Sequence, residues 1–422
     1  MRRILMFVDF SSLFVLFLFA GFVFLSNVSF VNAPLVAHYF NYFDVVFLFF
    51  CFVVFILCIA KIGRAANSMN HPWIIFSVSL ITKFIFVMLV NSKPESDYAV
   101  IFNAASSFSA GDISSFNVGP GAYYDVWAYQ SVYTLYQALV LYIYNSIDAL
   151  KILNVLFMSG SCVLVYKICS TIYSSNISFV VACLYALYPE MIFYSPVLTN
   201  QHLSTFFALG GVYFLFKRNY LSLICAGLFL SIANLMRPEI IIIFIALSFC
   251  LVVFCCEDNN RNDAFKKIAK FTLVVFIYVV TIMITSTAIK MSGVNKYGID
   301  NMNPEWKFMV GLDKEHDGTW NTSHAYILKM QDSAERRKEV IDYVKSTYNS
   351  TYDIFHFVYK KQSFMWSSFS PVYFTFNDGE LSRVIRLFGK EYYMNDLVNI
   401  FVSVDKIYYI IILGLFFISV ID

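Results

Sequence analysis

Ten apolar runs divide this chain of 422 residues. Most of them are about 17 residues or longer, which is the length an apolar helix needs to cross the hydrocarbon core of a bilayer. Because lipid offers no partner to backbone N–H and C=O groups, a spanning segment outside a closed barrel has to be helical. The runs are Phe10–Val31, Phe43–Ala60, Trp73–Val90, Ile147–Ile168, Ile177–Leu198, Leu203–Phe216, Tyr220–Met236, Ile240–Cys256, Phe271–Ile289 and Ile407–Val420.

The composition agrees with a membrane protein. Hydrophobic residues make up 59% of the chain and charged residues only 14%, with 46 Phe and 29 Tyr, which excludes a soluble core. The net charge of +2 comes from dispersed basic residues, so we expect no nucleic-acid partner. All nine Cys lie in or beside apolar runs and are typical of small buried hydrophobes, with no disulfide or metal-ligand spacing. We predict an all-α polytopic membrane protein with about ten transmembrane helices.

The N-terminus combines a basic start with a long apolar run, as a signal peptide does. Because the run is long and Pro34 directly follows the Ala33 at which cleavage would occur, we interpret it as an uncleaved anchor. Residues 1–71 are then an N-terminal membrane segment of two helices.

One further run, Ser131–Ile147, is interrupted by polar residues and rich in Tyr. Its placement decides the side of everything that follows, because Lys and Arg in short connections mark the cytoplasm. If it lies in the outer interface, eleven Lys and Arg are inside and three outside; if it spans, six are inside and eight outside. We therefore predict a helix lying in the outer interface, where a Tyr ring is buried and its hydroxyl hydrated.

Two outer segments follow from this topology. The second carries an expected helix start at Asp332 or Ser333 and a second amphipathic piece, YDIFHFVYKKQSFMW, that returns toward the membrane. The expected divisions are the N-terminal segment 1–71, a transmembrane core 72–290 with a first outer loop 91–148 that holds the interfacial helices, a larger extracytoplasmic loop 291–405, and a final transmembrane helix 406–422.

Asp97 is the first candidate for chemistry. It lies in SKPESDY, a few residues beyond an expected span and ahead of the interfacial helix, in a chain where charge is scarce. A carboxylate at this position can meet both a lipid headgroup and a water-soluble acceptor. Equally, Glu95 and Asp97 can simply mark the water boundary.

Arg237 is the second candidate. It lies with Pro238 in a very short turn between two apolar runs, on the outer side and against the positive-inside bias. Two anions can compensate it: Glu239, two residues on, or a bound phosphate.

Other polar residues occur within the apolar part of the chain. Asn200, Gln201 and His202 form an outward turn between two runs, where they can serve as a helix start or face the same compartment as Asp97. Lys83 lies within a run, where a charge is a functional hypothesis by default, although it can also snorkel or pair with Asp44. The sequence has no P-loop, Gly-rich dinucleotide turn, HExxH or GxSxG, so nucleotide-driven chemistry is not expected.

Several stretches together resemble the integral-membrane GT-C glycosyltransferases, in particular bacterial relatives of protein O-mannosyltransferases and of the lipid A aminoarabinose transferase. The resemblance covers about residues 72–370 and rests on the order and sidedness of its motifs. They are PESDYAVIFNAASSFSAGD, AYQSVYTLYQALVLYIYNS, LYALYPEMIFYSPVLTNQHLSTFFALGGVYFLFK, ANLMRPE and NPEWKFMVGLDKEHDGTWN. There are departures: the turn at Asn200 lacks the acidic residue common in the family, and no Pro precedes Gln130.

The resemblance implies an inverting transfer of a sugar from a polyprenyl-phosphate donor, undecaprenyl phosphate in bacteria, at the outer face of the cytoplasmic membrane. It makes Asp97 the general base and Arg237 a contact of the donor phosphate. It also implies substrate contacts at Tyr98, Gln130, Asn200, Gln201 and His202. The acceptor is a cell-envelope glycan, lipid or protein; no metal ligand or other cofactor is assigned, and the need for a divalent cation and the oligomeric state are left open.

Two rival functions remain. An O-antigen or capsule polymerase is also rich in aromatic residues and has a large outer loop, although it is expected to carry more Arg in its first outer segment. A flippase or transporter of lipid-linked glycans is expected to carry paired charges and broken helices near the membrane midplane.

Overall fold

The computed structural model confirms the all-α class. Within the residues described, the only strands are β1 (Val384–Leu387) and β2 (Lys390–Tyr393), which form an antiparallel hairpin. The residues described are 2–28, 33–116, 122–217, 219–257, 261–300, 303–330, 332–367, 372–387 and 389–421.

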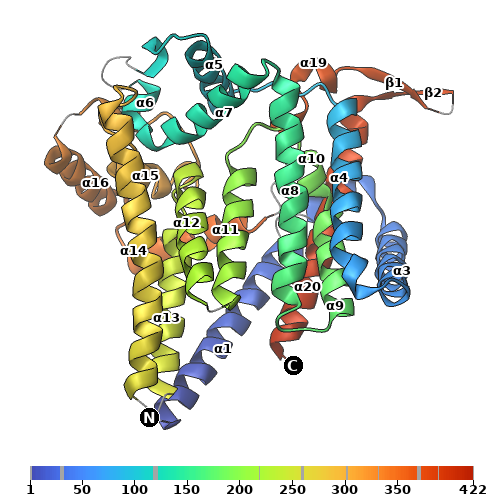
Figure 1. Ribbon diagram of the computed structural model, residues 1–422. Coiled ribbons are helices and arrows are strands. Elements are labelled where there is room, and N and C mark those ends of the chain that lie inside the picture. The colour runs from blue at the N-terminus through green and yellow to red at the C-terminus, as the bar shows by residue number, and fades with distance from the viewer. Residues whose placement is uncertain are drawn as a thin grey trace.

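Every apolar run of the sequence contributes to a helix of the bundle in Figure 1. Five of these helices are long and apolar enough to cross a membrane, namely α3, α4 with the turn before it, α8, α14 and α20, judged over the described residues. These helices support the assignment of the chain as a membrane protein. The number of about ten transmembrane helices stays a prediction. The bundle helices are α1 (Arg2–Ser26), α3 (Tyr42–Ala65), α4 (His71–Leu89), α8 (Ile147–Cys169), α9 (Ser175–Ala186), α11 (Gln201–Lys217), α12 (Tyr220–Met236), α13 (Ile241–Glu257), α14 (Arg261–Met291) and α20 (Met394–Ile421).

One expected span differs in the structure. The run Ile177–Leu198 is not a single helix, because α9 ends at Ala186 and a short α10 (Pro189–Phe193) follows. Proline at the first position of a helix has no N–H to give to the preceding turn, and it forces the residue before it out of the helical region. Tyr188 accordingly has extended backbone angles, with φ −63° and ψ 121°.

Close helix packing is centred on α11, α12 and α14. A Cβ on Gly211 of α11 would lie 2.7 Å from Leu230 of α12, and one on Gly227 of α12 would lie 2.9 Å from the carbonyl oxygen of Val274 in α14. Small residues let helix backbones approach in this way inside a membrane. These three helices therefore form a closely packed unit of the bundle.

Residues 91–148, the first of the two segments predicted to be outer, cover one end of the bundle, and we keep the name first outer segment for them. Figure 1 shows α5 (Asp97–Ser109), α6 (Tyr123–Val126) and α7 (Ser131–Ile143) lying over that end. Helix α7 is the Tyr-rich run, and it buries Tyr133, Gln137 and Leu141 on one face while Tyr142 is 76% exposed. As expected from the sequence, α7 lies across the bundle end and not alongside the long helices.

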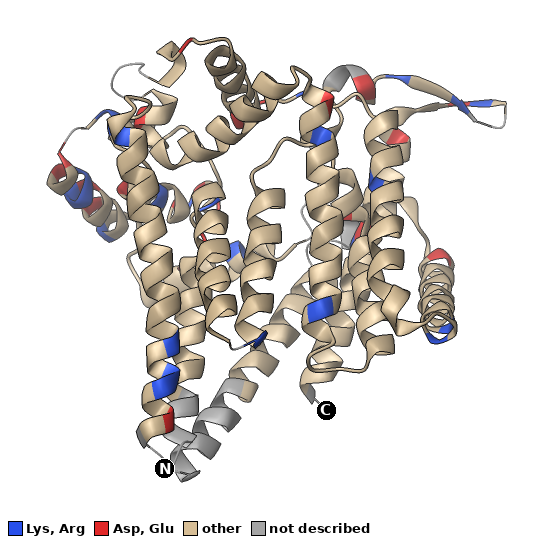
Figure 2. Cartoon of the chain, in the orientation of Figure 1, with Lys and Arg blue, Asp and Glu red and all other residues tan. Residues whose placement is uncertain are grey.

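The second outer segment meets the first at the same end of the bundle (Figure 1). Helix α16 begins as predicted, with the Asp332 carboxylate accepting from the N–H of Ala334 at 2.9 Å, and the amphipathic α17 returns to contact α1. Figure 2 shows most charged residues at the two bundle ends and in the outer segments. The further helices are α2 (Ala33–Tyr39), α15 (Pro304–Gly311), α16 (Ser333–Thr347), α17 (Thr351–Met365), α18 (Val372–Thr375) and α19 (Asp378–Leu381).

Candidate functional site

A cavity of about 360 Å³ lies where the two outer segments meet the bundle, and we call it the Asp97 cavity. Five of the seven predicted site residues line it, although they come from four separate stretches of the chain. They are Asp97, Tyr98, Gln130, Asn200 and Arg237. The fold therefore brings together a carboxylate and a guanidinium that are far apart in sequence.

Asp97 enters the cavity as the first residue of α5, directly after a tight turn. The N–H of Tyr98 donates to the carbonyl of Glu95 at 3.1 Å, and Ser96 between them has φ 52° and ψ −132°. These angles are those of the first central position of a type II′ turn, which strongly favours Gly. A non-Gly residue held there stores strain, and strain of this kind clusters at functional sites.

The electrostatic setting of Asp97 suits a base. Among the described residues, none donates a hydrogen bond to its carboxylate or forms an ion pair with it. Solvent still reaches the group, and partial desolvation by the surrounding protein raises its pKa above the ordinary value. A carboxylate with a raised pKa and unused acceptor atoms can accept a proton from a ligand hydroxyl.

Arg237 lines the same cavity and is fixed there by the end of α12. Its backbone N–H donates to the carbonyl of Ala233 at 2.9 Å, and Pro238 prevents the helix from continuing. The guanidinium Nε forms an ion pair with Glu239, so the nearby carboxylate is its partner in this structure. Only one of the three guanidinium nitrogens is used in that pair, and an Arg fork can bind a second anion through the others.

Lys307, from α15 in the second outer segment, is a cavity residue that we did not predict. Its ammonium lies 4.7 Å from the ring centre of Tyr129 and 5.1 Å from that of Trp127, and it donates to the Tyr129 hydroxyl at 3.2 Å. Partial burial, and secondly the positive charge of Arg237, lower its pKa. Arg237 and Lys307, two cations from separate parts of the chain, thus line one cavity. This favours an anionic ligand such as a phosphate.

Asn200 and Gln130 hold the cavity wall together. The Asn200 amide donates to Gln130 Oε1 at 3.1 Å and to the carbonyl oxygen of Met236, next to Arg237, at 2.8 Å. Asn200 is buried and uses its donors within the protein. It therefore acts in the structure as a brace between α7 and the end of α12.

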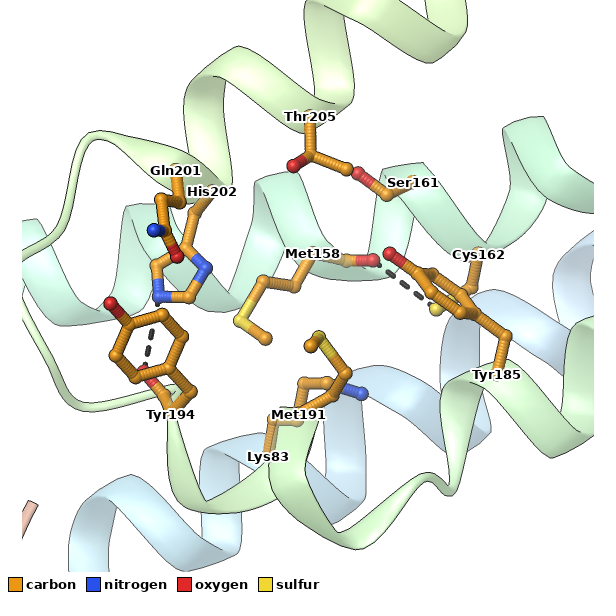
Figure 3. A pocket seen from close by; sticks show the side chains of 10 residues that line it. All are labelled: Lys83, Met158, Ser161, Cys162, Tyr185, Met191, Tyr194, Gln201, His202 and Thr205. Carbon is orange, nitrogen blue, oxygen red and sulfur yellow. Dashed lines mark hydrogen bonds between the residues drawn. The ribbon is translucent and has the colours of Figure 1, made fainter. Parts of the chain in front are cut away.

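Gln201 and His202 do not line the Asp97 cavity. Figure 3 shows both beside a second cavity of about 80 Å³, with Lys83, Tyr194 and Cys162, which we call the Lys83 cavity. The Nε2 of His202 donates to the carbonyl of Tyr194 at 3.1 Å. The tyrosine pair Tyr98 and Tyr194, with hydroxyls 3.0 Å apart, stands between the two cavities.

Lys83 neither snorkels nor pairs with Asp44. It is 1% exposed, and its ammonium donates to Ser79 Oγ at 2.9 Å and to the carbonyl of Ala186 at 2.7 Å. Asp44 instead caps its own helix with Asn41. Neutral acceptors therefore satisfy this lysine within the bundle.

A metal site finds no support in the part of the chain that the structure describes. No group of three or more His, Cys, Asp or Glu side chains there is placed to hold an ion. The cavity itself offers the Asp97 carboxylate and the paired Glu239.

Comparison with known proteins identifies no family for this chain. No family model matches the chain, and no curated protein is significantly similar to it in sequence.

Proposed function

We propose that this protein is an inverting glycosyltransferase that uses a polyprenyl-phosphate sugar as donor. The observation that carries the proposal is the Asp97 cavity at the end of an apolar helix bundle. Its lining includes the Asp97 carboxylate, which has no partner among the described residues, and the two cations Arg237 and Lys307. Sugar transfer from a lipid phosphate needs these two kinds of group in one place.

The residues divide the chemistry between the two ends of the reacting bond. Asp97 takes the proton from an acceptor hydroxyl while the oxygen of that hydroxyl attacks the anomeric carbon in line. The bond from that carbon to the donor phosphate oxygen breaks, and the electron pair leaves with the phosphate. Arg237 and Lys307 stabilise the departing charge, so no separate proton donor is needed.

The donor and acceptor of the proposal rest on the resemblance to the GT-C glycosyltransferases, and its sidedness rests on the distribution of Lys and Arg along the sequence. The donor is an undecaprenyl-phosphate sugar, and the bundle lies in the bacterial cytoplasmic membrane with the Asp97 cavity on the extracytoplasmic side. The acceptor is a glycan, lipid or protein of the cell envelope. Tyr98, Gln130 and Tyr133 supply polar and aromatic surface for the sugar within the cavity.

Features of the cavity weigh against the rivals. A transporter places charges along a path through the bundle, but buried Lys83 is held by neutral acceptors and the cavity charges gather at one end. A polymerase is expected to present Arg from both outer segments, whereas the cation that the second segment adds to this cavity is Lys307.

Mass analysis of cell-envelope glycans tests the proposal in cells with the gene, without it, and with Asp97→Asn. The matched control is Asp112→Asn, an exposed acid just after α5 that accepts from the N–H of Ser114 at 2.8 Å. A single missing sugar in the gene-free and Asp97→Asn cells, but not in the control, supports transfer. Loss of long chains indicates a polymerase, and accumulation of finished units inside the cell indicates a transporter; either outcome refutes the proposal.

A further inference from the structure

The break between α9 and α10 leaves a helix end inside the bundle, where Ala186, the last residue of α9, is fully buried. The last four carbonyl groups of an α-helix have no partner within the helix. In the interior of a membrane protein water does not replace these partners, so other groups of the protein have to donate. Two of the four carbonyls, those of Cys183 and Tyr185, accept from backbone N–H groups just beyond the helix at 3.0 and 3.4 Å. The carbonyls of Leu184 and Ala186 remain.

Side chains of two other helices donate to these remaining carbonyls. The hydroxyl of Tyr408 in α20 donates to the carbonyl of Leu184 at 3.1 Å. The ammonium of Lys83 in α4 donates to the carbonyl of Ala186 at 2.7 Å. The first donor is neutral and the second is a cation, and a positive charge is stabilised at the C-terminal end of a helix, where the carbonyl dipoles point. The structure therefore shows a cation bound at the end of α9.

Neutral groups surround this ammonium. Its second hydrogen bond goes to Ser79 Oγ at 2.9 Å, which also accepts from the Ser159 hydroxyl at 3.2 Å and lies 3.4 Å from the Cys162 thiol. Lys83, Ser79 and Ser159 are each 1% exposed or less. Among the described residues, no carboxylate forms an ion pair with Lys83. Carbonyl and hydroxyl oxygens at a broken helix suit a monovalent cation such as sodium, whereas calcium sites usually include carboxylates.

We propose that the end of α9 is a binding site for a monovalent cation, which the chain fills with the ammonium of its own Lys83. Because this cation is tethered to α4, the wild-type protein needs no ion from solution. The Lys83 cavity of about 80 Å³ lies beside the side chain and has room for more than one water molecule (Figure 3). Removal of the lysine side chain therefore leaves a hydrated site that sodium or a small organic ammonium ion can enter. This site is independent of the proposed sugar transfer and of the orientation of the protein.

Thermal unfolding of the full chain with Lys83→Ala tests the site. The variant is purified in sodium chloride and exchanged into N-methylglucamine chloride of the same ionic strength, whose cation is much larger than the site. There it should melt at a lower temperature than the wild type, because the Ala186 carbonyl loses its partner. The melting temperature should then rise with added sodium or n-propylammonium, since a ligand that only the folded state binds stabilises it by mass action. The wild type should melt at the same temperature in all three salts.

Tyr408→Phe is the matched control, because it removes the neutral donor at the same helix end and leaves Lys83 in place. Its melting temperature should fall by an amount that sodium does not restore. If Lys83→Ala does not fold in sodium chloride, Lys83→Gln decides the question, since it keeps a neutral donor and should still be less stable than the wild type. The site is overturned if neither sodium nor n-propylammonium stabilises Lys83→Ala, if sodium stabilises the control equally, or if Lys83→Gln matches the wild type.

Discussion

The replacement Asp97→Asn separates a catalytic role from a structural one. Asn has nearly the same shape, and the carboxylate has no protein partner among the described residues, so the substitution removes a base without breaking a contact. Loss of a general base lowers a rate by about 10²- to 10⁴-fold, which is roughly 3 to 5 kcal/mol of transition-state stabilisation. The other carboxylate of the cavity, Glu239, is committed to Arg237 and is not expected to substitute.

The same replacement, Asp97→Asn, should raise the stability of the folded protein although it lowers the activity. The pKa of Asp97 is raised by desolvation in the folded protein, so the folded state binds this proton more tightly than the unfolded state does. The charged carboxylate therefore costs stability at pH values above the folded pKa, and that cost disappears as the pH falls through it. A neutral Asn never bears the cost, and Asp97→Asn should raise the melting temperature slightly at neutral pH.

The assay is transfer of a labelled sugar from a polyprenyl-phosphate donor by purified protein, with thermal unfolding measured on the same sample. Wild-type transfer should fall as the pH is lowered through the raised pKa of Asp97, because the protonated acid cannot act as a base. Asp97→Asn should lose both the activity and this pH dependence while remaining folded. Substantial residual transfer, or a lower melting temperature, would refute the reasoning.

Three further changes test other parts of the structure. Lys307→Met should lower kcat/KM for the lipid-linked donor roughly 10- to 100-fold, since a hydrogen bond to a charged group is worth about 1.5 to 3 kcal/mol; unchanged donor dependence in steady-state kinetics would remove Lys307 from the site. Ser96→Gly should relieve the positive φ and stabilise the protein by about 1 kcal/mol in thermal unfolding, and a loss of stability would show that the turn is not strained. Gly227→Ala should cost about 1 to 3 kcal/mol, because the new Cβ would meet the Val274 carbonyl at 2.9 Å; full stability in detergent would contradict the close packing of α12 and α14.

The helices were largely predictable because long runs of apolar residues identify them in the sequence. Each apolar run contributed to a helix, and Asp332 capped α16 as its sequence indicates. The break before Pro189 was also encoded locally, but the apolar residues on both sides hid it in a continuous run. The number of membrane spans cannot be read from polarity alone, since several apolar helices of the bundle are shorter than a membrane-crossing helix needs to be.

Site residues were predictable where a local motif identifies them. The prediction failed where the direction of a side chain, set by the fold, decides which cavity it lines. Asn200 lines the Asp97 cavity, yet Gln201 and His202 line the other one, because successive residues of a helix start point in directions about 100° apart. Lys307 lies in the stretch NPEWKFMVGLDKEHDGTWN, but nothing in that stretch indicated that this residue belongs to the site. It reaches the cavity because the second outer segment packs against the first, which places its ammonium near the rings of Trp127 and Tyr129.

The position of Lys307 depends in turn on packing outside the cavity. Two residues earlier in α15, Glu305 is buried and pairs with Arg336 of α16 at 3.3 Å, with both side chains 8% exposed. Arg337, also of α16, lies 3.4 Å from the same carboxylate, so two arginines of α16 fix α15 against it. The cation over Tyr129 is therefore held by a folded loop and not by a flexible tether. For the proposed sugar transfer that rigidity would matter, because a phosphate leaves fastest when the charges that receive it are already in place.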